Sequence, residues 1–113
     1  MTLIYKICDA ALWREAERSG TFAGAGIDLR DGYIHFSAPD QVAETAAKHF
    51  SGQCDLLLIA VAADALGPAL LWEPSRGGAL FPHLYAPLPL SAVRSVTPLP
   101  LGPDGELVLP DLL

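Results

Sequence analysis

Residues 55–62 read Asp-Leu-Leu-Leu-Ile-Ala-Val-Ala, so seven apolar residues follow one aspartate without a polar residue between them. A strand with one face in water alternates apolar and polar residues, whereas a strand covered on both faces is apolar throughout. Because turn signals bound the run, we interpret it as a strand at the centre of a sheet. A chain of 113 residues built around such a strand is expected to form a single domain, residues 1–113, with one hydrophobic core.

Two helices are predicted in the first half of the chain, over residues 10–18 and 41–50. Asp9 precedes the first helix as an expected N-cap, and Gly20 supplies its end. Ser37 is the expected N-cap of the second helix. Apolar residues recur at helical spacing in the second helix, which predicts a face that packs on a sheet.

Most of the remaining chain predicts strands separated by turns. Besides residues 55–62, strands are expected at residues 3–8, 33–37, 69–72, 79–85, 93–101 and 106–109. Residues 21–32 carry glycines and aspartates without periodicity and indicate a loop, and Arg76-Gly77-Gly78 indicates a turn. Because the helices come early and the strands come late, the pattern favours an α+β fold with a mainly antiparallel sheet over alternating βα units.

The charge of the chain limits its partners. The formal net charge is −6 with only 7 lysines and arginines, so counterion release from a phosphate backbone would contribute little to binding. General nucleic-acid binding is therefore not expected, whereas a local phosphate site stays open because it needs only a few residues. No apolar stretch approaches the roughly 20 residues of a membrane helix, so we expect no membrane association and a cytoplasmic location.

Two histidines are the leading candidates for chemistry. The twofold period of a strand places His35 on one face together with Tyr33 and Ser37. It also places His83 and Tyr85 on one side of a short strand, whose internal proline is typical of an edge or bulge beside a functional site. Structural histidines with hydrogen bonds to the surrounding chain are the alternative, and the residues alone leave both interpretations open.

Glu73 and Arg76 stand close together near the predicted turn. The planar guanidinium of Arg76 suits a carboxylate or a phosphate, and a salt-bridged turn is the alternative interpretation. A metal ion would need three or four converging ligands, and the chain offers His35, His49, His83 and Glu73 without a metal-binding spacing. We therefore predict no metal site.

The sequence resembles an uncharacterised bacterial family, domain of unknown function 952. The resemblance spans most of residues 4–96 and rests on a combination of short motifs, each of which is weak alone. The matching pieces are Ile4-Tyr5-Lys6-Ile7, Trp13, Asp31-Gly32-Tyr33-Ile34-His35-Phe36-Ser37, Gln41, Thr45, Leu71-Trp72-Glu73 and Gly78-Ala79-Leu80-Phe81-Pro82-His83-Leu84-Tyr85.

That family is distantly similar to the ADP-ribosyltransferase fold, in which a split antiparallel sheet holds the nicotinamide end of NAD between three motif positions. The resemblance implies Tyr5 or Lys6 at the first position, His35 and Ser37 at the second and His83 at the third. The third position departs from the usual glutamate, because a histidine does not supply a fixed negative charge. That departure puts transfer to a protein in doubt and leaves a reaction similar to that of RNA 2′-phosphotransferases open.

The leading hypothesis is a transferase that acts on NAD, ADP-ribose or a related nucleotide, with His35 and His83 as acid, base or hydrogen-bonding groups in one cleft. If one site exists, both imidazoles should open into the same concavity. Arg76 would hold a phosphate and a tyrosine would stack on a ring. The expected ligand-binding residues are Tyr5, Lys6, Tyr33, Ser37, Glu73, Arg76 and Tyr85.

Two alternatives remain open on sequence grounds. The first is a non-catalytic module that binds a small metabolite or a protein partner. The second is a purely structural histidine pair without a ligand. The sequence does not specify the oligomeric state, since an exposed edge strand is also compatible with a dimer.

Overall fold

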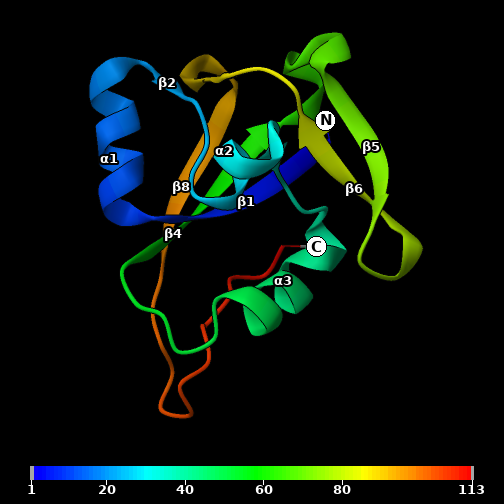
Figure 1. Ribbon diagram of the computed structural model, residues 1–113. Helices are drawn as coiled ribbons and strands as arrows, with labels where there is room; N and C mark the ends of the chain where they lie inside the picture. The colour runs from blue at the N-terminus through cyan, green and yellow to red at the C-terminus, as the bar shows by residue number, and fades with distance from the viewer. Residues whose placement is uncertain (1, 113) are drawn as a thin grey trace.

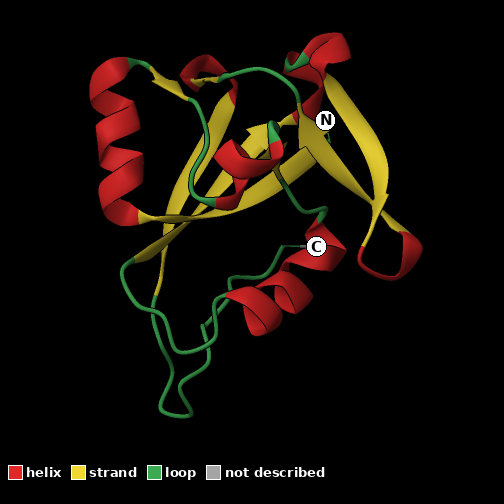
Figure 2. Cartoon of the chain, viewed as in Figure 1, coloured by secondary structure: helices red, strands yellow, loops and turns green. Residues whose placement is uncertain are grey.

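A computed structural model describes residues 2–112, except the side chain of Arg76. The fold is built mainly from antiparallel strands (Figures 1 and 2). The α-helices are α1 (Ala10–Ser19), α2 (Ile27–Asp31) and α3 (Val42–His49). The strands are β1 (Leu3–Asp9), β2 (Thr21–Phe22), β3 (Ile34–His35), β4 (Leu56–Ala62), β5 (Leu70–Ser75), β6 (Ala79–Leu84), β7 (Leu88–Pro89) and β8 (Val93–Leu99).

The central strand is β4, as the apolar run predicts. It lies between β1 and β8 and pairs antiparallel with both. All seven of its residues are buried. Leu57, Ile59 and Val61 join one apolar cluster with Trp13, while Leu56, Leu58 and Ala60 join a second cluster. The strand is therefore covered on both faces.

A second sheet, ordered β3-β6-β5, stands beside the first (Figure 1). Its β5–β6 hairpin turns at residues 76–78, where the sequence predicts a turn. One antiparallel bridge links the two sheets, because Tyr5 and Ser37 each donate a backbone N–H to the other's carbonyl, at 2.8 Å in both directions. The bridge places β1 of the first sheet beside the segment that follows β3.

The register of β3 on β6 positions the two candidate histidines. Ile34 pairs with Leu84, and His35 pairs with His83 directly across the ladder. Side chains of directly opposed residues lie on the same face of a sheet. Ile34 and Leu84 therefore point together into the core, where both are buried, and the two histidines point together to the other side.

The first helix follows its predicted caps. The Asp9 carboxylate accepts hydrogen bonds from the N–H groups of Ala11 and Leu12, and Gly20 ends α1 with φ of 94°. A left-handed residue at that place lets the Gly20 N–H reach the carbonyl of Ala16, which glycine does without steric strain.

Three local predictions are wrong. The region predicted as a loop contains the helix α2, which is too short to show helical periodicity. Ser37 is not an N-cap: the chain turns into a 3-10 helix one residue later, at Ala38, whose N–H donates to the Gln41 side chain. Residues 106–109 form no strand, because only Leu107 pairs, in an isolated bridge with Leu101.

The class of the fold is α+β with mainly antiparallel sheets, as the order of elements predicts. It has a third α-helix beyond the two N-terminal helices expected from the sequence. Within residues 2–112, none of the helices has the length and apolar character needed to cross a membrane.

Truncation of a central β4 side chain tests the core. Leu58 is 2% exposed, so Leu58→Ala removes buried methyl groups from a packed interior and should lower the free energy of unfolding by about 2 to 5 kcal/mol. Leu80→Ala is the matched control, because Leu80 is 51% exposed and should change stability far less. Chemical denaturation of both variants measures the difference, and equal losses would contradict this assignment of the core.

Candidate functional site

A cavity of about 460 Å³ lies where β1, α2, β3, α3 and β6 meet. Its volume is within the range of small-molecule sites, about 300 to 1,000 Å³. All three histidines of the chain line it, with aromatic and hydroxyl side chains around them. The lining residues that matter below are Tyr5, Lys6, Ile27, Asp31, Tyr33, His35, Ser37, Thr45, His49, Phe81 and His83.

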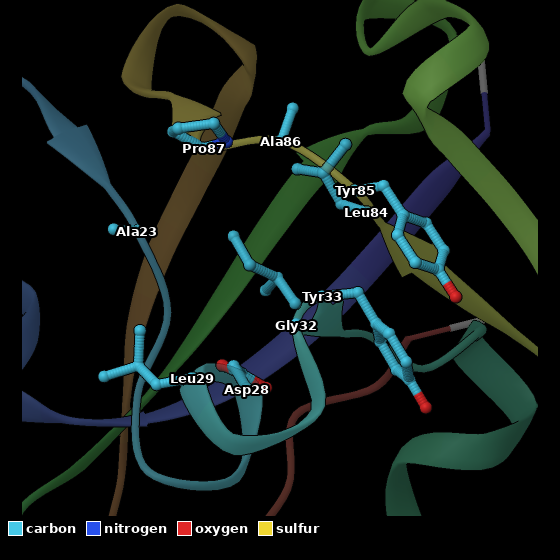
Figure 3. Close-up of a pocket in the computed structure, with 10 residues that line it drawn as sticks. Ala23, Asp28, Leu29, Gly32, Tyr33, Leu84, Tyr85, Ala86 and Pro87 are labelled. Atoms are coloured by element: carbon cyan, nitrogen blue, oxygen red, sulfur yellow. The ribbon is translucent and has the colours of Figure 1, made fainter.

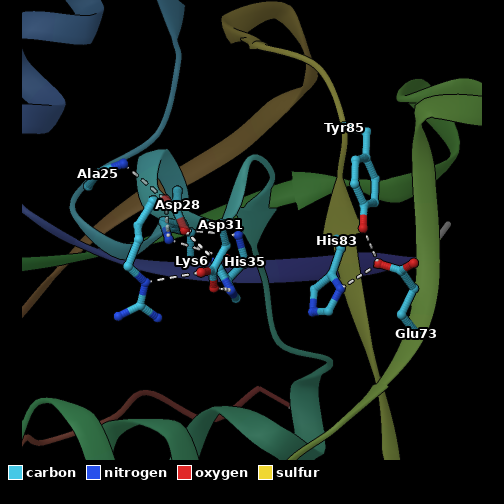
Figure 4. Close-up of polar contacts among 9 residues, drawn as sticks. Lys6, Ala25, Asp28, Asp31, His35, Glu73, His83 and Tyr85 are labelled. Carbon is cyan, nitrogen blue, oxygen red and sulfur yellow. Dashed lines mark hydrogen bonds and ion pairs between the residues drawn. The ribbon is translucent and has the colours of Figure 1, made fainter.

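Asp28 contacts Lys6 and His35, two residues that line the cavity (Figure 4). Its carboxylate is fully buried and has four close partners. Oδ1 accepts the backbone N–H of His35 at 3.1 Å and lies 2.7 Å from Nδ1 of the same residue. Oδ2 accepts the N–H of Ala25 at 3.0 Å and lies 2.8 Å from Nζ of Lys6. The carboxylate thus ties β1, the chain before α2, and β3 together.

The ionised form of Asp28 is strongly favoured. Burial acts to raise the pKa of this carboxyl, but the hydrogen bond from His35 and the charge of Lys6 outweigh it and lower the pKa to about 2. Lys6 in turn is buried and donates to the carbonyl of His35 at 3.2 Å. Its ammonium group is therefore engaged with the protein.

His35 lies between two carboxylates. Nδ1 faces Asp28, and Nε2 lies 3.1 Å from Oδ2 of Asp31, which also pairs with Arg30. A carboxylate only accepts hydrogen bonds, so both ring nitrogens can donate at once only when the ring carries two protons. Each ring nitrogen of His35 thus faces a carboxylate oxygen.

His83 has a different environment on the opposite strand. It is only 3% exposed, and its Nδ1 lies 2.8 Å from Oε1 of Glu73. The hydroxyl of Tyr85 donates to the same oxygen at 2.7 Å. The bonds from Tyr85 and His83 lower the pKa of Glu73, so Glu73 is an acceptor and Nδ1 of His83 carries the proton. Among the described residues no hydrogen-bond partner lies at Nε2.

Aromatic rings hold the two histidines together. Tyr33 stacks on His83 with ring centroids 4.3 Å apart and an interplanar angle of 24°. Its ring also lies 4.6 Å from that of His35 and 5.0 Å from that of Tyr85. The imidazoles of His35 and His83 are 5.4 Å apart, edge to face. A smaller pocket of about 250 Å³ also has Tyr33 in its wall, together with Tyr85 (Figure 3).

The structure brings most of the residues proposed from the sequence to one place. Tyr5, Lys6, Tyr33, His35, Ser37 and His83 line the cavity. Glu73 and Tyr85 stand behind His83 and hold it. The hydroxyl of Ser37 lies 2.9 Å from that of Thr45. The expected phosphate contact by Arg76 falls on a side chain outside the described part of the chain, although the preceding Ser75 lines the cavity.

Sequence reasoning missed the acidic residues of α2 and the role of His49 as a lining residue. Asp28 and Asp31 fall in the segment interpreted as a loop, and their contacts with β1 and β3 leave no local signal. The sequence holds one hint: a buried lysine needs a charged or polar partner, and the predicted site names none for Lys6. In the described part of the chain, no group of three or more His, Cys, Asp and Glu side chains is placed to hold a metal ion.

Loss of the Asp28 charge should destabilise the protein in a pH-dependent way. Asp28→Asn leaves the buried Lys6 without its carboxylate, which should lower the free energy of unfolding by about 3 to 5 kcal/mol at neutral pH. The folded pKa, about 2, is below the ordinary value of 3.8. The stabilisation is therefore complete above about pH 4 and is lost as the pH falls toward 2.

Denaturation of wild type and Asp28→Asn across this acid range measures the effect, with the exposed Asp64→Asn as control. The pKa of Asp28 falls from 3.8 to about 2 on folding, so the wild type should lose stability as the pH falls from 4 to 2. This loss should be steeper than that of Asp28→Asn. Parallel curves for the two proteins would contradict the assigned role of Asp28.

Comparisons with known proteins agree with this fold. The chain is similar to protein CC0527 from Caulobacter crescentus, whose crystal structure is 54% identical, has a TM-score of 0.92, and is matched over 96% of this chain and 95% of that one. The solution NMR structure of CC0527 is 55% identical, with a TM-score of 0.84 over 94% of this chain and 91% of that one. No curated protein matches the chain. Residues 7–96 match the family model described as protein of unknown function, DUF952, and the chain belongs to that family.

Proposed function

We propose that the chain is an enzyme that acts on NAD, ADP-ribose or a related nucleotide in the cavity between His35 and His83. The observation that carries the proposal is the pairing of two histidines in unlike environments, with rings 5.4 Å apart in one cavity. His35 faces two carboxylates, whereas His83 has one carboxylate partner and one open nitrogen. Unlike environments of two titratable groups are the usual basis for separate acid and base roles.

His83 is the proposed base. Glu73 accepts a hydrogen bond from Nδ1–H of His83 and so fixes the tautomer. The lone pair of Nε2 then faces the cavity. That nitrogen takes the proton from an attacking hydroxyl or water. His35 is the proposed acid: its Nε2, on the side of Asp31 that lines the cavity, gives a proton to the leaving group.

The walls of the cavity support a ligand with a planar ring and a sugar. The ring of Tyr33 lines the cavity beside His83, and Ser37 and Thr45 bring hydroxyl groups to the lining. The volume of about 460 Å³ suits one nucleoside-sized half of a dinucleotide. Tyr5 lines the same space, and Arg76 remains the proposed phosphate contact beyond Ser75.

The ADP-ribosyltransferase resemblance proposed from the sequence motifs implies the same ligand class. Two antiparallel sheets joined by the Tyr5–Ser37 bridge agree with a split-sheet architecture. In this proposal His83 takes the place of the usual glutamate, and Glu73 on the adjacent strand accepts a hydrogen bond from it. A negative charge is thus present near that position, and it acts through the imidazole. The rival proposal is a non-catalytic module that binds a small metabolite or a protein partner.

A thermal-shift screen with NAD, ADP-ribose, AMP, divalent metals and a neutral sugar tests the proposal. At a ligand concentration a hundred times the Kd, a true ligand should stabilise the fold by about 2.7 kcal/mol. Product formation from each stabilising nucleotide is then followed by NMR. Binding without turnover would favour the non-catalytic module, and no response to any nucleotide would contradict the proposal.

His83→Asn is the diagnostic variant. The asparagine amide can keep the hydrogen bond to Glu73 near the place of Nδ1, but no atom remains at the place of Nε2. We therefore expect the unliganded melting temperature to fall by only a few degrees, while turnover falls at least 100-fold. Alanine is unsuitable, because His83 is buried and its truncation also removes packing. His83→Asn with wild-type turnover would rule out His83 as the base.

A further inference from the structure

His83 presents to the cavity one nitrogen whose hydrogen-bonding capacity no described residue uses. The residue is 97% covered, yet it lines the cavity beside His35. Nε2 is not enclosed by protein atoms, since Trp13 Nε1 is the one fully buried side-chain nitrogen or oxygen without a partner among the described residues. A bound ligand can supply the missing partner, and the chemistry of that partner follows from the protonation of the ring.

In the neutral tautomer of His83, the contact with Glu73 holds the proton at Nδ1. Oε1 of Glu73 lies 2.8 Å from this nitrogen and already accepts the hydroxyl proton of Tyr85, so it is an acceptor for both. A neutral imidazole with a proton at Nδ1 has only a lone pair at Nε2. The open nitrogen therefore accepts a hydrogen bond and does not donate one.

We propose that the cavity selects ligands that present a hydroxyl or an amide N–H to Nε2 of His83, and rejects ligands that present only an acceptor oxygen at that place. The inference rests on the proposed function only in treating the cavity as a ligand site. Tyr33 adds the second requirement, since its ring lines the same cavity beside His83 and an aromatic wall favours a planar group. The ligand class is a planar ring that carries a hydrogen-bond donor.

Glu73 is the residue that sets this preference without touching the ligand. It lies on β5 and faces the Nδ1 side of the ring. Replacement by leucine removes the acceptor that holds the proton at Nδ1, which leaves Nε2 free to carry the proton and donate. A site that binds a donor through a buried acceptor discriminates strongly against ligands that lack the donor. Glu73→Leu should therefore reverse the discrimination.

Three small probes of similar shape test the inference. Benzamide offers an N–H donor, methyl benzoate is a neutral acceptor, and benzoate is an anionic acceptor. Their affinities are measured by NMR titration, and ¹⁵N shifts of the His83 ring report which nitrogen carries the proton. In the wild type, Nδ1 should be protonated, and benzamide should bind about tenfold more tightly than methyl benzoate or benzoate.

In Glu73→Leu the ¹⁵N shifts of His83 should show the proton on Nε2 instead of Nδ1. The preference for benzamide should then vanish or reverse. Glu44→Leu is the matched control, because Glu44 is an exposed carboxylate on α3 that pairs with Lys48. It should retain the wild-type ranking. The inference is overturned if Nε2 of wild-type His83 is protonated, if methyl benzoate or benzoate binds as tightly as benzamide, or if benzamide does not bind.

The two proposals fail separately. Nucleotide binding with a probe ranking led by benzoate would leave the nucleotide site in place and overturn the donor requirement. A ranking led by benzamide without any response to nucleotides would support the donor requirement and overturn the nucleotide site.

Discussion

The buried carboxylate of Asp28 is the interaction on which the site depends. It is the common partner of Lys6 from β1, of the backbone and ring of His35 from β3, and of the chain before α2. Lys6 lies on the seven-residue strand β1, whereas β3, which carries His35, is only two residues long. A buried charge is tolerated when its lone pairs are fully used, and the four contacts of Asp28 meet that condition. The orientation of His35 is therefore determined from inside the protein.

Strand register then brings the second histidine to the first. A one-residue slip of β6 against β3 would turn His83 into the core and Leu84 outward, because side chains alternate across a strand. The apolar pair of Ile34 and Leu84 opposes such a slip, since both are buried in the main cluster. Core packing on one face of the small sheet thus holds the polar pair in place on the other.

Sequence reasoning succeeded where the signal is local and failed where it is not. The apolar run of β4, the caps of α1 and the alternation around His35 and His83 each depend on neighbouring residues, and all three agree with the structure. The five residues of α2 span little more than one turn, so no periodicity distinguishes them from a loop. Asp28 pairs with residues from separate strands, and nothing in its own segment indicates them.

The two histidines differ in how well packing alone explains them. His35 has a carboxylate at each ring nitrogen, which is the condition expected of a structural histidine as well as of an acid. His83 is more deeply buried, yet only its Nδ1 is engaged by the described residues. Nε2 is not among the fully buried side-chain atoms without a partner, so it is open to the cavity that His83 lines, and packing alone gives no role to a nitrogen in that position. The open nitrogen of His83 is therefore the feature that a purely structural pair leaves unexplained.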